Sequence, residues 1–157
     1  MERRKFLGLG LTAAAVLPVA LSAKDFRKEK PDAWTALTGA KESAPGKIDS
    51  AVKALYGDIK TVEEGVKVQA PKVASNGGAV PVKIQSDIPA KSVALFQDVN
   101  PEATVAVWDL SEGGMIDYSV KIKMKGSGTI TAIVEGKDGK FYLGKVSLEV
   151  ALGGCEG

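Results

Sequence analysis

The chain has 157 residues, of which 21 are basic, 19 are acidic, one is cysteine and none is histidine. Without histidine, Ser-His-Asp and Cys-His catalysis are excluded and the commonest metal ligand is missing. A single cysteine cannot form an intrachain disulfide, a Cys-x-x-Cys redox pair or a zinc-thiolate cluster. Carboxylate-only hydrolysis stays formally possible, but nothing singles out an acid/base pair. We therefore expect no catalytic residue, no metal site and no cofactor.

Residues 1–23 are predicted to be an export signal. They begin with Arg3 and Arg4, continue with an apolar stretch to about Leu21 and end in small residues near Ala23. Paired arginines followed by Lys, Phe and Leu are typical of a twin-arginine signal, with a Sec signal and an uncleaved anchor as alternatives. No other apolar run approaches the roughly 20 residues that a membrane-spanning helix needs. We therefore expect a soluble periplasmic product that is not a membrane protein.

The balance of charge changes once this signal is removed. The signal contains three basic residues and one acidic residue, so the rest of the chain contains 18 of each. The mature chain is formally neutral, and the basic precursor is no argument for a nucleic-acid partner. The roughly 134 residues that remain are enough for one domain with one core.

The first part of the mature chain is predicted to be polar and partly helical. Residues 24–46 form a lead-in that prolines and glycines interrupt, with Trp34 and Leu37 as its main apolar anchors. In residues 47–59, apolar side chains recur at spacings of three and four, and Gly57 is a stop signal near the end. This spacing predicts one amphipathic helix that closes one side of the core.

After Gly65 the apolar pattern changes from helical to alternating, which is typical of strands. The predicted strands are 66–69, 80–84, 92–97, 104–110, 115–125, 129–135 and 140–152. Turn sequences rich in Gly, Asn and Asp separate them, at 76–78, 100–102, 112–114, 126–128 and 137–139. Short strands with no helices between them predict an all-β fold. We expect an immunoglobulin-like antiparallel β-sandwich of about seven strands, with an N-terminal helical segment, over residues 47–152.

The clearest alternation lies in the predicted strand 115–125. There, Lys121, Lys123 and Lys125 alternate with three apolar residues. A row of lysines is most simply a solvated sheet face or a guarded edge, and the alternative is a surface for an anionic partner.

The alternation ends at Leu152, and the last residues are Gly153, Gly154, Cys155, Glu156 and Gly157. Paired glycines have wide backbone freedom, so residues 153–157 are predicted to be a flexible swinging arm that carries the thiol of Cys155. Such an arm favours covalent attachment of a cargo that other proteins process. An intermolecular disulfide and an incidental free thiol are the alternatives.

This tail, preceded by the last predicted strand and the turn at 137–139, resembles the end of SoxY proteins, the sulfur carriers of the periplasmic thiosulfate-oxidising Sox system. The resemblance extends to the stretch APKVASNGGAVPVKI at 70–84, to the helix at 47–59 and to the twin-arginine signal. One residue departs from the pattern: the family tail is usually Gly-Gly-Cys-Gly-Gly, and this chain has Glu156.

The resemblance implies an immunoglobulin-like carrier that forms a heterodimer with SoxZ, a second small β-sandwich protein. Cys155 would hold thiosulfate-derived sulfur covalently, as an S-thiosulfonate and then a persulfide. Three enzymes would dock transiently: SoxAX, a haem protein that joins thiosulfate to the thiol; SoxB, a metal-dependent hydrolase that releases sulfate; and, in many organisms, SoxCD, which oxidises the remaining sulfane sulfur. The alternative function is a periplasmic β-sandwich interaction module whose lone cysteine forms an intermolecular disulfide.

Overall fold

The computed structural model describes residues 24–35 and 46–151. Its helical segments are α1 (Phe26–Glu29), η1 (Pro31–Trp34), α2 (Lys47–Tyr56) and η3 (Gly77–Ala79). Its strands are β1 (Thr61–Val62), β2 (Lys67–Gln69), β3 (Val73–Ala74), β4 (Val80–Ser86), β5 (Ala90–Gln97), β6 (Thr104–Asp109), β7 (Ile116–Ile122), β8 (Gly128–Gly136) and β9 (Phe141–Val150). Within these described ranges, no helix has the length and apolar character needed to cross a bilayer.

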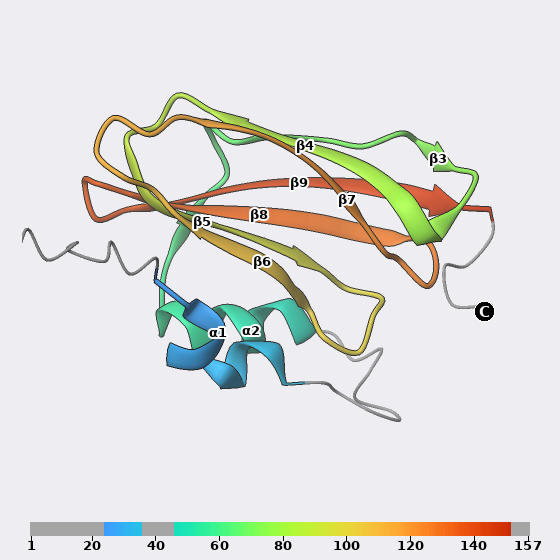
Figure 1. Ribbon diagram of the computed structural model, residues 1–157, viewed down its shortest axis with the longest axis horizontal. Helices are drawn as coiled ribbons and strands as arrows, with labels where there is room; N and C mark the ends of the chain where they lie inside the picture. Colours follow the sequence, from blue (N-terminus) through green and yellow to red (C-terminus); the bar gives the residue numbers. More distant parts are fainter. Residues whose placement is uncertain (1–23, 36–45, 152–157) are drawn as a thin grey trace, which may run out of the picture.

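The strands form two sheets that face each other, which confirms the predicted β-sandwich (Figure 1). The larger sheet has the order β1-β9-β8-β5-β6, with β3 also paired to β9, and the smaller sheet has the order β2-β4-β7. The long strands pair in the antiparallel direction as predicted, but β1 and β3 pair with β9 in the parallel direction. Two residues are too few to show an alternating pattern, so the sequence did not predict these two short strands.

A first apolar core fills the space between the two sheets. It is built from inward-facing side chains that are at most 5% exposed, among them Val80, Val82, Ile84, Val93, Leu95, Ile122, Met124, Ile130 and Val134. Burying each large aliphatic side chain contributes about 1.5–3 kcal/mol. This core joins β4 and β7 of the smaller sheet to β5 and β8 of the larger one.

A second apolar core lies on the outer face of the larger sheet, where the helical segments cover it (Figure 1). Trp34 and Leu55 from the helices pack there against Phe96 and Ile133 from the sheet. Because β5 is covered on both faces, its residues from Ser92 to Gln97 are all buried. Helix α2 therefore covers this second core, which lies outside the sandwich.

Helix α2 ends three residues before the predicted bound of 59, at the stop signal Gly57. It stops at Tyr56, and Gly57 follows with a positive φ of 82°, a backbone conformation that favours glycine. The Tyr56 hydroxyl lies 3.0 Å from Ser92 Oγ, which donates a hydrogen bond to Glu135 Oε2 at 2.8 Å. Burial raises the pKa of Tyr56, so this hydroxyl stays protonated and links α2 to the larger sheet.

Candidate functional site: the base of the C-terminal arm

The predicted arm itself lies outside the described residues. This applies to Gly153, Gly154, Cys155, Glu156 and Gly157, and the last described residue is Ala151. Sulfur attachment at Cys155 and the role of residues 153–157 as an arm therefore stay predictions. What the structure does describe is the point at which the arm begins, at the end of β9.

The end of β9 is held by hydrogen bonds on both of its edges. On one edge, Glu149 N donates to Lys72 O and Ala151 N donates to Ala74 O, each at 2.9 Å. On the other edge, Val150 N donates to the side chain of Ser127, also at 2.9 Å. Three consecutive amide groups of β9 thus have partners, and the backbone is fixed as far as Ala151.

Strand β3 exists because of this pairing. Its residues Val73 and Ala74 lie parallel to Glu149 and Val150 of β9. Ala74 points into the core between the sheets and is 5% exposed, whereas Val73 points outward and is 56% exposed. The buried alanine anchors the strand that holds the arm base.

The loop between β7 and β8 supports the other edge of β9. Met124 is fully buried, and its backbone N–H donates to Gly77 O at 2.8 Å. Asn100 from the β5–β6 loop donates through Nδ2 to Lys123 O at 2.7 Å and accepts through Oδ1 from Lys125 N at 2.9 Å. One asparagine side chain therefore joins the two loops.

The β5–β6 loop is in turn organised by a buried glutamine. The Gln97 side chain accepts hydrogen bonds from Val99 N at 2.8 Å and Asn100 N at 2.7 Å, and donates to Glu102 O at 2.6 Å. Lys47, at the start of α2, donates to Asn100 O, and burial lowers the pKa of its ammonium group. No buried side-chain nitrogen or oxygen of the described residues lacks a hydrogen-bond partner, and such satisfied networks make a loop rigid.

The predicted lysine row is exposed, but it does not lie in one strand. Lys121 belongs to β7 and lies opposite Pro81 of β4, whereas Lys123 and Lys125 follow in the loop. The predicted strand 115–125 is too long because β4 begins at Val80, which pairs with Ile122. Beyond that pair, the neighbouring strand has no residue left to continue the ladder.

The described side chains at the arm base can position the backbone of β9 and attract an anionic partner. They are lysines, a serine hydroxyl and an asparagine amide, together with backbone groups. Among the described residues there is no cluster of three or more Asp, Glu, His or Cys that could hold a metal ion. The arrangement is therefore suited to hold in place the strand that leads to a reactive group beyond Ala151.

Replacing Ser127 with alanine should loosen the arm base without unfolding the domain. The change removes the acceptor of the Val150 amide, a hydrogen bond worth about 1 kcal/mol. Hydrogen exchange followed by NMR should show faster exchange of the Val150 amide, by up to about tenfold. Ser147→Ala is the matched control, because the Ser147 hydroxyl contacts only a threonine hydroxyl, that of Thr129, in the described hydrogen bonds. Equal exchange at Val150 in both variants would contradict the role given to Ser127.

Comparison with known proteins gives a match to the model of one protein family. Residues 52–155 match the model of the family described as sulfur oxidation protein SoxY. This range includes the arm base and Cys155. A search of curated proteins gives no match.

The solved structures that are similar to this one include a sulfur carrier and a superoxide reductase. The sulfur carrier protein SoxY from Chlorobium limicola f. thiosulfatophilum is 27% identical, with a TM-score of 0.62 over 68% of this chain and 98% of that chain. A superoxide reductase (neelaredoxin) from Ignicoccus hospitalis is 17% identical, with a TM-score of 0.50 over 59% of this chain and 94% of that chain. The second likeness shows a shared fold and nothing more.

Proposed function

Since the chain belongs to the SoxY family, we propose that it is a periplasmic carrier that holds the sulfur intermediates of thiosulfate oxidation covalently on Cys155. The coarser role, a carrier protein of a sulfur-oxidation system, follows from the family itself. The observation that carries the finer proposal is the family match over residues 52–155, which extends from the sandwich through the arm base to the cysteine.

The chemistry at Cys155 needs a thiol and enzymes supplied by other proteins. Loading is an oxidation in which a new S–S bond forms: R–SH + S₂O₃²⁻ gives R–S–S–SO₃⁻, H⁺ and two electrons, which a haem protein of the SoxAX type accepts. Hydrolysis by a SoxB-type enzyme then breaks the bond to the sulfonate: R–S–S–SO₃⁻ + H₂O gives R–S–SH, SO₄²⁻ and H⁺. Where a SoxCD-type enzyme is present, it oxidises the sulfane sulfur that remains.

The structure supports this division of labour through the arm base. The backbone is fixed as far as Ala151, and Cys155 follows four residues later. Four residue steps span at most about 14 Å, so the thiol can enter a cleft in another protein while the sandwich stays outside. Because the carrier chain contains no histidine, it is not expected to process its own cargo.

The partners and the compartment belong to the same proposal. A SoxZ-like β-sandwich subunit forms the heterodimer, and the enzymes that act on the arm dock transiently. Export by the twin-arginine-type signal at residues 1–23 places the carrier in the periplasm with them. Neither nucleic acid nor a membrane is part of this function.

Intact mass spectrometry of the protein, purified from its host during growth on thiosulfate, tests the proposal. We expect a fraction of the molecules to carry one added thiosulfate group or one added sulfur atom, and fragmentation should map the addition to Cys155. A disulfide from Cys155 to another protein would favour the alternative interaction module. A bare thiol under all growth conditions would contradict both functions.

A further inference from the structure

Two long stretches of the chain contain lysine but no acidic residue. Residues 66–86 contain Lys67, Lys72 and Lys83, and residues 118–134 contain Lys121, Lys123 and Lys125. The chain after the predicted signal contains 18 basic and 18 acidic residues, so its acidic residues must be concentrated elsewhere. The chain is neutral as a whole, but these stretches are strongly basic.

The fold brings the two stretches together beside the arm base. They pair along β4 and β7, with Pro81 opposite Lys121, and Gly77 O accepts a hydrogen bond from Met124 N. Each stretch also binds the end of β9, one through Lys72 O and the other through Ser127 Oγ. The arm therefore begins at the border of a basic surface.

We call the exposed side chains of Lys72, Lys121 and Lys123 the arm-base lysines. The nearest acidic residue of β9 is Glu149, and it points away from this surface. Its neighbours Leu148 and Val150 pack in the core between the sheets, so Glu149 lies on the outer face of the larger sheet. Asp117 of β7 lies on the same face as Lys121, but its carboxylate forms an ion pair with Lys83 at 3.2 Å, and Lys83 is not one of the arm-base lysines.

An apolar groove lies beside Lys121. It has a volume of about 390 Å³, its floor includes Ala70, Pro71, Pro81 and Val120, and Lys121 is at its rim. Pro71 directly precedes Lys72, whose carbonyl holds β9. The groove therefore starts one residue away from the arm base.

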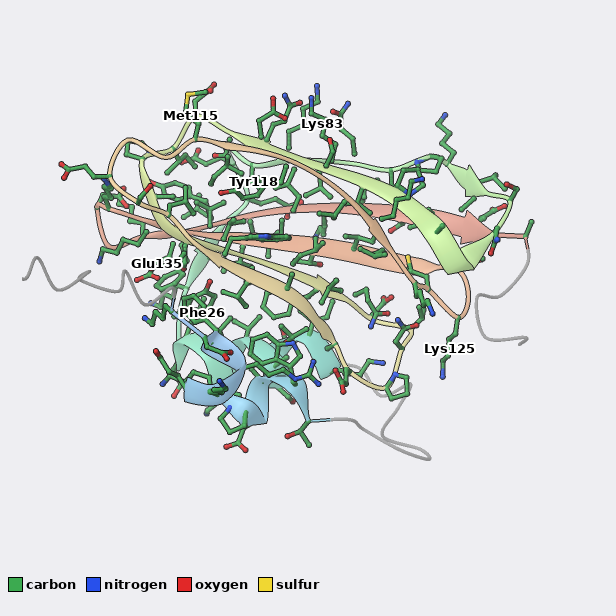
Figure 2. The ribbon with its side chains drawn as sticks, viewed as in Figure 1. Phe26, Lys83, Met115, Tyr118, Lys125 and Glu135 are labelled. Carbon is green, nitrogen blue, oxygen red and sulfur yellow. The ribbon has the colours of Figure 1, made fainter. Side chains whose placement is uncertain are left out.

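A larger groove, of about 720 Å³, lies at the other end of the sandwich beside Met115. Figure 2 shows Met115 and Lys125 at opposite ends of the molecule. Strand β9 has ten residues and spans about 33 Å between those ends. Cys155 reaches at most about 14 Å from Ala151, so of these two grooves the one beside Lys121 lies nearer to its working range.

Any enzyme that reacts with Cys155 must bring its active-site entrance within about 14 Å of Ala151. Its surface must then contact the part of the carrier that surrounds the arm base. We propose that the arm-base lysines and the groove beside Lys121 are the docking site for these enzymes. The entrance of such an enzyme is acidic and places an apolar side chain in the groove. Complementary charge of this kind raises the rate of encounter and fixes orientation. This inference rests on the proposed function.

Charge reversal at the three arm-base lysines tests the docking site. In the full-length carrier, Lys72→Glu, Lys121→Glu and Lys123→Glu are combined and loading with thiosulfate by the purified SoxAX-type enzyme of the host is measured. The control combines Lys60→Glu, Lys137→Glu and Lys140→Glu, which change the net charge equally at exposed positions near the other end of β9. We expect kcat/KM for loading to fall at least tenfold in the first variant at low salt, through KM, and little in the control. The difference should shrink as salt is added, because salt screens charges.

A second measurement separates docking from thiol reactivity. Reaction of Cys155 with 4,4′-dithiodipyridine, a small neutral disulfide, should proceed at the same rate in both variants and in the unmodified carrier. The docking site would be overturned if both variants were loaded equally well or lost the same part of their kcat/KM for loading. It would also be overturned if the arm-base variant lost reactivity towards the small disulfide to the same extent as it lost loading. If the unmodified carrier is not loaded at all, the proposed function fails and the docking site fails with it. If the unmodified carrier is loaded and the arm-base variant is loaded equally well, only the docking site fails.

Discussion

Replacing Cys155 with serine should abolish the attachment of sulfur and leave the fold intact. A serine hydroxyl cannot form an S–S bond, and the chain has no second cysteine to take over. Both apolar cores are built from residues at or before Val150, so the change removes no core contact. Intact mass after incubation with thiosulfate and the loading enzyme should show no addition. The thermal unfolding midpoint should match that of the unmodified carrier.

The matched control for this change is Glu156→Gly, which restores the tail that is usual in the SoxY family. A carboxylate next to the thiol opposes formation of the thiolate and repels an anionic adduct, but salt screens both effects. Loading of this variant should therefore equal that of the unmodified carrier or exceed it by a few-fold. Sulfur on the Cys155→Ser protein, or growth on thiosulfate supported by it, would show that Cys155 is not the attachment site.

Replacing Phe96 with alanine should lower the free energy of unfolding by about 3–5 kcal/mol. Phe96 is fully buried at the centre of the core between the larger sheet and the helical segments. Alanine would leave a cavity in a layer whose residues come from several separate parts of the chain, so collapse around it should be incomplete. Denaturant unfolding followed by circular dichroism measures the change.

Phe141→Ala is the control for this second prediction. Phe141 contributes to the same layer, with its ring centroid 5.1 Å from that of Tyr56, but it is only partly buried. The same chemical change should therefore cost clearly less at this position. Equal losses at Phe96 and Phe141 would mean that the helical layer does not exclude solvent in the way the structure shows.

The long elements could be predicted because their side chains repeat with a clear period. The helix at Lys47–Tyr56 and the seven longer strands show such patterns, and Gly57 ends the helix through its positive φ. The position of α2 was less predictable. The apolar face of α2 could cover either sheet. Only the second core, which includes Phe96, shows that α2 covers the larger sheet.

The arm base could not be predicted from local patterns. Strand β3 has only two residues. The carbonyl groups of Lys72 and Ala74 bind β9 because the chain crosses from β2 in the smaller sheet to the edge of the larger sheet, where it lies beside Glu149. Ser127 looks like an ordinary turn residue in the sequence. Its hydroxyl acts as a ladder partner because β8 begins one residue later, at Gly128, which leaves the Val150 amide without a strand carbonyl.

The sequence by itself determined which residue types this protein lacks and where its single thiol lies, because composition and position do not depend on folding. The absence of histidine and the place of Cys155 after paired glycines already favour a carrier. Only the tertiary structure decided what surrounds the end of β9. The two acid-free stretches are separated by the 31 residues from 87 to 117. They lie together because β4 pairs with β7 and both stretches bind the end of β9. The interaction between charges depends on their distance in space, so the electrostatic potential beside the end of β9 depends on this long-range strand pairing.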